Sequence, residues 1–215
     1  MTGLTLIGAG KFALEITRYV EDAFAARGGL RVERYLSVPG EQVQVPAGRC
    51  AELDTCDLPA GTPVVLAVAD PATRREIIDR HIVGRGLLAE NVVHPSSRVD
   101  PAQLTGPGNV IGPHCYLGVN VSLGGFNVIN YHCTVGNHSH LGSNNFLSPN
   151  FHCGNSVAVG DDNFFGLGCT LVPEVVIGSS SRFQAGITVF EDAPSGHTYL
   201  LPNRIKALPI SPASR

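Results

Sequence analysis

Apolar side chains recur at every sixth position over the second half of the chain. Counted in sixes from Val93 to Val189, sixteen of the seventeen first positions are apolar, and Thr105 is the exception. A glycine follows the first position in ten of these hexads. An amphipathic helix cannot keep a strict period of six, because its own period is 3.6 residues. The pattern therefore predicts short strands joined by corners and repeated as a solenoid.

A second period of 18 residues is superimposed on the first. Asn109, Asn127, Asn145 and Asn163 are spaced by 18 and all occupy the fifth place of their hexads. Three hexads therefore form one triangular coil of a parallel β-helix, and each coil adds a rise of about 4.8 Å, the spacing of neighbouring strands. Stacked asparagine amides can hydrogen-bond to one another from coil to coil.

The six cysteines do not indicate a disulfide framework. No CxxC motif occurs, and the chain is too long and too apolar to need covalent cross-links. Cys115, Cys133 and Cys169 share one column of the 18-residue repeat, in which Phe151 fills the gap between Cys133 and Cys169. We expect these cysteines to be small buried side chains.

The first part of the chain shows a different pattern, that of a small βαβ domain. Apolar strands are predicted at Leu4–Ile7, Arg31–Leu36 and Pro63–Ala69, and an amphipathic helix at Phe12–Phe24. Asp70, followed by a proline, is expected to cap a second helix.

The turn after the first strand is a candidate substrate-binding element. A strand, a glycine turn and a helix N-terminus can cradle a phosphate, so Gly8, Gly10, Lys11 and Phe12 are candidate substrate-binding residues. The turn lacks the third glycine of the dinucleotide fingerprint, and Ser37 rather than an acidic residue follows the second strand. The alternative is that this domain binds no phosphate and only orients the acceptor molecule or stabilises the assembly.

Composition limits the function classes. The net charge of −3 gives no basic surface for nucleic acid, and no apolar run reaches the length of a membrane span. The N-terminus lacks the basic and apolar regions of a signal peptide, so a cytoplasmic protein is expected. The expected domains are 1–88 (βαβ), 89–192 (β-helix) and 193–215 (tail).

Both halves together resemble the sialic acid O-acetyltransferase (NeuD-like) family of hexapeptide-repeat sugar acyltransferases. The resemblance rests on LIGAGKFALEI at the first strand and turn, on AVADPATRREII at the third strand, and on the hexads from Val92 to Val189. It implies a left-handed β-helix, a homotrimer, acetyl-CoA as acyl donor, no metal, and transfer of the acyl group directly to a sugar or a nucleotide-linked sugar. O- and N-acylation both remain open.

The resemblance also implies a histidine as general base on one corner of a coil. The family pattern I-N-x-x-x-x-[VI]-x-H-D matches Ile129 and Asn130, but it places the family histidine at Asn137, one residue before His138. His138 is therefore the candidate base, with Asn137 at the family position. Asn130 is a candidate for orienting the acceptor, and His140 for orienting the base.

Small residues in the last coils are implied to line the arm of the acyl donor, because a cofactor that passes close to the main chain needs them. These candidate cofactor-binding residues are Gly166, Leu167, Gly168, Ala185 and Gly186.

Two other functions use the same fold. A γ-carbonic-anhydrase-like enzyme would need three histidines around a zinc ion, and its usual His-x4-His spacing is missing. A non-catalytic sugar-binding or assembly protein is the other alternative, because Asn137 replaces the family histidine.

Overall fold

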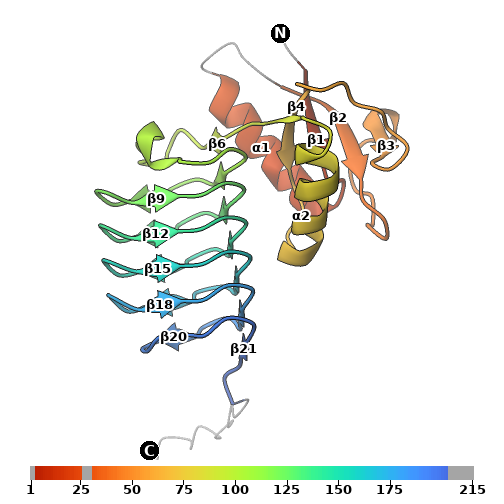
Figure 1. The fold of residues 1–215 in the computed structure, drawn as a ribbon. Helices are drawn as coiled ribbons and strands as arrows, with labels where there is room; N and C mark the ends of the chain where they lie inside the picture. The colour runs from red at the N-terminus through yellow and green to blue at the C-terminus, as the bar shows by residue number, and fades with distance from the viewer. Residues whose placement is uncertain (1–2, 26–30, 203–215) are drawn as a thin grey trace, which may run out of the picture.

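A computed structural model describes residues 3–25 and 31–202. The chain forms a small α/β domain that sits beside the first coils of a long β-helix, and the coils run away from this domain toward the C-terminus (Figure 1). No helix in the described ranges is both long and apolar enough to cross a membrane.

The N-terminal domain has a five-stranded parallel sheet with strand order β3-β2-β1-β4-β5. The predicted strands and the cap at Asp70 are present, whereas the two short edge strands β3 and β5 were not predicted. The Asp70 carboxylate accepts a hydrogen bond of 3.0 Å from the backbone N–H of Thr73. The elements are β1 (Gly3–Ile7), α1 (Lys11–Ala25), β2 (Arg31–Ser37), β3 (Cys50–Glu52), β4 (Pro63–Leu66), α2 (Pro71–Ile77), the π-helical turn η2 (Ile78–Val83) and β5 (Leu88–Ala89).

The remainder is a left-handed parallel β-helix with three flat faces. The first face contains β6 (Val92–Val93), β7 (Val110–Ile111), β10 (Val128–Ile129), β13 (Phe146–Leu147), β16 (Phe164–Phe165), β19 (Arg182–Phe183) and β21 (Thr198–Tyr199). The second face contains β8 (Tyr116–Leu117), β11 (Thr134–Val135), β14 (His152–Cys153), β17 (Thr170–Leu171) and β20 (Thr188–Val189). The third face contains β9 (Ser122–Leu123), β12 (His140–Leu141), β15 (Ala158–Val159) and β18 (Val176–Ile177). We name the corners after the faces that they join: corner 1–2, corner 2–3 and corner 3–1.

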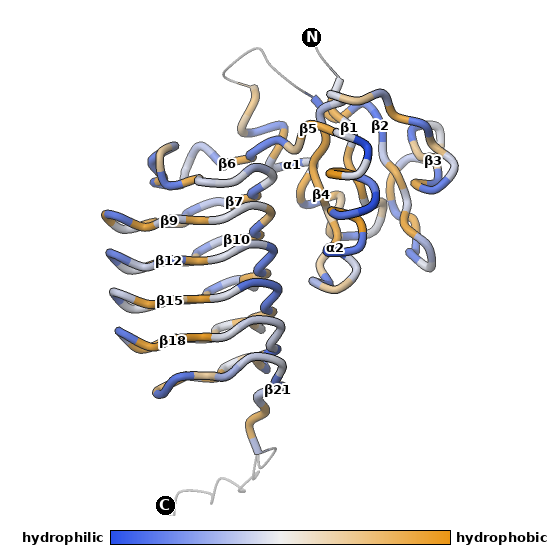
Figure 2. The backbone as a smooth tube through the Cα atoms, in the orientation of Figure 1, coloured by the Kyte–Doolittle hydropathy of each residue, from blue (hydrophilic) through white to orange (hydrophobic). Residues whose placement is uncertain are grey.

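The predicted 18-residue register is confirmed. Val128 pairs with Val110 on one side and with Phe146 on the other, and each following strand pair keeps the same offset through β20. One residue of each strand points inward into a continuous core, as the apolar strand segments of the coils indicate (Figure 2). The cysteine column is buried as expected, and burial raises the pKa of the Cys169 thiol.

The corners differ from the expectation in where their backbone turns. Every sixth residue from Gly108 to Gly186 has a positive φ, and most of these positions are not glycine; His138, for example, has a φ of 59°. This residue is the fourth of each hexad. The frequent glycine at the second place has another cause, since a Cβ on Gly136 would collide with the backbone of Gly154 in the next coil.

The first coil departs from the strict register. The short helix η3 (Pro101–Gln103) bulges outward, and Leu104 rather than Thr105 pairs with Leu123 and packs on the core. This shift of one residue explains why Thr105 was the polar exception among the hexads. At the other end, Thr198 pairs with Arg182 across only 16 residues, so the first face continues beyond the expected limit at residue 192. Residues 203–215 of the expected tail lie outside the described residues.

The N-terminal domain packs on the first face and on corner 3–1. Outward residues of the first face, including Val128 and Phe146, share a hydrophobic cluster with α1. Arg74 on α2 is fully buried and donates to Asn144 Oδ1 at 2.8 Å and to the carbonyl of Val68 at 2.9 Å, and also to the carbonyl of Phe126. Burial lowers the pKa of Arg74 to about 9, and these acceptors replace the water that its guanidinium loses. The second face and corner 2–3 are outside this interface.

The asparagine ladder at corner 3–1 ties the coils together. Asn145 Nδ2 donates to Asn127 Oδ1 at 3.1 Å and to the carbonyl of Gly160 at 2.8 Å, and Asn145 Oδ1 accepts from the backbone N–H of Asn163 at 3.0 Å. All four asparagines of the predicted column are fully buried. The ladder and the backbone carbonyls beside it therefore satisfy these buried amides.

We expect Asn145→Leu to lower the free energy of unfolding by about 2–4 kcal/mol, because it leaves buried donors and acceptors of two neighbouring coils without partners. Urea denaturation followed by circular dichroism measures this loss. Thr170→Ala, on the outer side of the second face, is the matched control and is expected to change stability little. Equal stability of the two variants would contradict the role given to the ladder.

Candidate active site

His138 lies at the tip of corner 2–3, on the surface that the N-terminal domain leaves uncovered. Its backbone N–H donates to the carbonyl of Val119 at 2.8 Å, which holds the corner to the coil above. The imidazole is exposed, and its Nδ1 lies 3.2 Å from Asn120 Nδ2. The side chain of His138 is therefore free to meet a substrate while its backbone is fixed.

Asn137 and Asn130 have structural hydrogen bonds. The side-chain Oδ1 of Asn137 accepts from the backbone N–H of Val119 at 2.8 Å, and the backbone N–H of Asn137 donates to Asn155 Oδ1 at 2.9 Å, so this residue links three coils. Asn130 is buried and donates to the carbonyl of Leu147 at 3.0 Å. The structure thus gives Asn137 and Asn130 contacts with the backbone, and their catalytic roles stay predictions.

The remaining histidines of the coils lie on other surfaces. His140 is on the third face, where its Nδ1 is 2.7 Å from Ser122 Oγ, and His152 is on the second face, where its Nδ1 is 2.8 Å from Thr134 Oγ1. His114 and His132 stack at corner 1–2 with ring centroids 5.1 Å apart. His140 is only two residues from His138, but it points from a face rather than from the corner.

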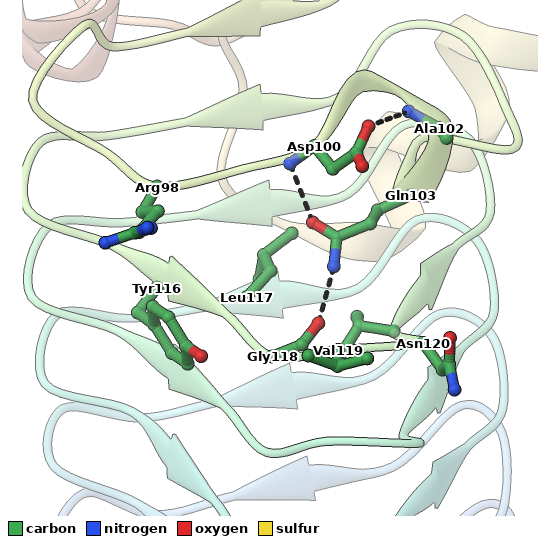
Figure 3. Close-up of a pocket in the computed structure, with 10 residues that line it drawn as sticks. Arg98, Asp100, Ala102, Gln103, Tyr116, Leu117, Gly118, Val119 and Asn120 are labelled. Carbon is green, nitrogen blue, oxygen red and sulfur yellow. Dashed lines mark hydrogen bonds between the residues drawn. The ribbon is translucent and has the colours of Figure 1, made fainter.

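A groove of about 690 Å³ opens on the second face and reaches corner 2–3 (Figure 3). Its wall is the bulging first coil, and its floor is the segment from Tyr116 to Val121. Asn120, the neighbour of the His138 imidazole, lines the groove together with Arg98, Asp100 and Gln103. The groove therefore ends beside the candidate base.

The predicted cofactor-binding residues lie on a different corner. Leu167 and Gly168 are at corner 1–2, as are Ala185 and Gly186 one coil further along. A two-residue strand of the second face and its flanking residues separate this corner from corner 2–3, a span of roughly 17 Å. One chain thus presents the candidate base and the candidate donor site on opposite sides of its second face.

The glycine turn of the N-terminal domain already holds an anion. The Glu41 carboxylate accepts hydrogen bonds from the backbone N–H of Gly10 at 2.7 Å, of Ala9 at 2.8 Å and of Val38 at 3.2 Å. Phe12 contacts Phe146 of the β-helix, with ring centroids 5.6 Å apart. The backbone donors that were expected to cradle a phosphate are therefore bound to a side chain of the same chain. A role of Gly8, Gly10, Lys11 and Phe12 in substrate binding stays a prediction.

A hollow of about 260 Å³ lies near this turn, at the carboxyl ends of the strands. His81, on the π-helical turn, is almost fully buried in its wall, and its Nε2 is 3.5 Å from Asp54 Oδ1. Burial, reinforced by the nearby Arg85, lowers the pKa of His81, so its neutral form is favoured. Ligands of open α/β sheets bind at this edge.

Within residues 3–25 and 31–202, no three His, Cys, Asp or Glu side chains come close enough together to hold a metal ion. The sequence analysis did not identify four residues that the structure places in the groove or at the glycine turn: Asn120, Arg98, Tyr116 and Glu41. Asn120 could have been found, because it precedes His138 by 18 residues and must stack on it. Glu41 has no such signal, since its contact depends on a loop.

Several solved structures have a fold similar to that of this chain. The chain matches no protein-family model and no curated protein. It is similar to the acetyltransferase domain of PglB from Neisseria gonorrhoeae FA1090, with a TM-score of 0.78 and 21% identity, covering 92% of this chain and 96% of that chain. The same domain in complex with acetyl coenzyme A gives a TM-score of 0.76, 21% identity, and coverage of 91% and 94%.

A mutant of perosamine N-acetyltransferase from Caulobacter crescentus, in complex with CoA and GDP-perosamine, is also similar. Its TM-score is 0.69 and its identity 24%, covering 96% of this chain and 98% of that chain. At these identities the likeness demonstrates a shared fold over both domains.

We expect Glu41→Ala to lower the free energy of unfolding by about 1–3 kcal/mol, because three backbone N–H groups lose a charged acceptor. Thermal and urea unfolding of the full-length protein provide the measurement. Glu52→Ala is the control, since Glu52 lines a surface pocket together with Glu41 but does not accept these hydrogen bonds. A loss no larger than that of Glu52→Ala would show that the carboxylate does not hold the turn.

Proposed function

We propose that the chain is an acyltransferase that moves an acetyl group from acetyl-CoA to a hydroxyl or amino group of a sugar or a nucleotide-linked sugar. The observation that carries the proposal is the likeness of fold over nearly the whole chain, both domains included, to a domain seen with acetyl coenzyme A and to an N-acetyltransferase seen with CoA and a nucleotide-linked sugar. The similar solved structure that is named as an N-acetyltransferase favours an amino group as the acceptor. Use of acyl-CoA fits a cytoplasmic reaction.

His138 is the base in this proposal. The acceptor oxygen or nitrogen attacks the thioester carbonyl carbon, its proton passes to the imidazole, and the carbon–sulfur bond breaks. The imidazole then returns the proton to the leaving thiolate, so that the products are the acetylated sugar and free CoA. No covalent bond to the protein is needed. Such proton transfer contributes roughly 10²–10⁴-fold to the rate.

Asn120 is the positioning residue for this base. In the structure, Nδ2 of its amide lies 3.2 Å from Nδ1 of His138, where it can only donate a hydrogen bond. The proposal therefore requires the flipped amide, whose oxygen accepts from Nδ1–H and leaves the lone pair of Nε2 free to take a proton from the acceptor. Asn120 thereby takes the place of the carboxylate that orients the imidazole in many acid–base pairs.

The separation of the candidate sites supports a trimer. The donor residues at corner 1–2 and the base at corner 2–3 lie on opposite sides of the second face of one chain. A second copy could bring its own corner 1–2 against corner 2–3 and complete the site. Light scattering is expected to give three times the chain mass of 22.7 kDa; a monomer at catalytic concentration would contradict the shared site.

A non-catalytic protein is the second candidate. The observation in its favour is Asn137, which stands at the expected position of the family histidine and is bound to the backbone of the coil above. Release of free thiol from acetyl-CoA in the presence of amino sugars, nucleotide-linked amino sugars and sialic-type acids separates the two candidates. No thiol release and no CoA binding would reject the acyltransferase.

The variant His138→Asn tests the base. Asparagine tolerates the positive φ of this corner, so the fold is expected to remain intact while thiol release slows by about 10²-fold or more. Ser180→Asn is the matched control, because Ser180 is exposed and has the same positive φ at corner 3–1, away from both candidate sites. An unchanged rate in His138→Asn, with normal rate in the control, would remove His138 from the mechanism.

A further inference from the structure

The groove on the second face has a wall of hydrogen-bonded polar side chains. Gln103 is buried; its Nε2 donates to the carbonyl of Gly118 at 2.5 Å, and its Oε1 accepts from the N–H of Asp100 at 2.9 Å. Asp100 in turn accepts from the N–H of Ala102 at 2.9 Å. Figure 3 shows this chain of hydrogen bonds crossing the middle of the groove. These groups make the outward bulge of η3 a rigid wall.

Arg98 and Tyr116 lie at one end of the groove, and their side chains take no part in these hydrogen bonds. They are neighbours on the outer side of the second face, since Arg98 pairs with Tyr116 as an isolated bridge. In the described part of the chain, the Arg98 guanidinium forms no ion pair and no side-chain hydrogen bond, and the Tyr116 side chain is 45% exposed. On the single chain, a guanidinium and a phenol ring thus lie side by side at the surface.

The other end of the groove leads to the candidate base. Asn120 lines it and contacts the imidazole of His138, and Val119 in the floor is hydrogen-bonded to the backbone of His138. A molecule lying along the groove would therefore have one end at Arg98 and Tyr116 and the other near His138. The wall formed by η3 exists only in the first coil, so this is the only level of the described second face with such a wall.

The chemistry of these groups indicates a sugar that bears an anionic group. An aromatic ring offers a flat apolar surface to the C–H face of a sugar ring, and a guanidinium binds a carboxylate or a phosphate through paired hydrogen bonds. Asp100, on the wall, disfavours a second negative charge near the middle of the groove but can accept hydrogen bonds from hydroxyl groups.

We propose that this groove is the acceptor subsite, in which Tyr116 packs against the sugar ring and Arg98 binds its carboxylate or phosphate. The inference rests on the proposed function for the identity of the site, but binding in the groove can be measured without turnover. It makes Arg98 a specificity-determining residue: the enzyme selects acidic or phosphate-linked sugars over neutral ones.

Isothermal titration calorimetry of the full-length protein, without acyl donor, tests the subsite. The probes are N-acetylneuraminic acid for a carboxylate, UDP-N-acetylglucosamine for a phosphate link, and N-acetylglucosamine as the neutral sugar. We expect one charged probe to bind at least about tenfold more tightly than the neutral sugar. Arg98→Ala should abolish that preference, Arg98→Lys should restore part of it, and Tyr116→Ala should weaken all three. Arg18→Ala, an exposed arginine on α1, is the control and should change nothing.

Charged probes that bind no better than the neutral sugar, or that bind equally to Arg98→Ala, would overturn the proposal. The proposal would also be overturned if Arg98→Ala weakened the binding of CoA and left the binding of the sugars unchanged, because the groove would then bind the acyl donor. A separate CoA titration keeps the two proposals apart. If CoA binds and Arg98 has no effect on the sugars, only the subsite is wrong. If sugar binding depends on Arg98 but CoA does not bind, only the acyltransferase is wrong.

Discussion

The structure depends on hydrogen bonding between residues 18 positions apart. Each coil leaves backbone and amide groups that only the next coil can satisfy, and the chain meets this demand with strand pairs on the faces and with the Asn127–Asn145–Asn163 ladder inside corner 3–1. A slip of one residue would turn every inward side chain outward. The repeat therefore fixes not only the core but also which side chains reach each face and corner.

The same register determines where chemistry is feasible. In its first coils the first face is apolar on its outer side and packs against α1, and corner 3–1 is bound to α2 through Arg74. The second and third faces and corners 1–2 and 2–3 remain open, and His138 and Asn120 stack at corner 2–3. The irregular first coil adds the wall that turns part of the second face into a groove. The N-terminal domain covers only the first face and corner 3–1.

Periodicity was sufficient to predict the β-helix, its 18-residue coil and its buried columns, because each position repeats the environment of the one above it. It could not predict the shift that places Leu104 in the core, since η3 is held by side chains of Asp100 and Gln103 in a single coil. It also missed the contact of Glu41 with the glycine turn, which depends on a loop without a repeat. The groove was missed for the same reason: Arg98 and Tyr116 become neighbours of a wall only once that bulge exists.

A crystal structure of the protein with CoA and an acceptor sugar would test the central claim most directly, namely that the register creates the reaction site at corner 2–3. The account predicts the sulfur of CoA and the reacting atom of the sugar beside the imidazole of His138, with the donor also touching corner 1–2 of a neighbouring copy. The account would be contradicted if both ligands were bound beside His114 and His132 of one chain and corner 2–3 were exposed to solvent.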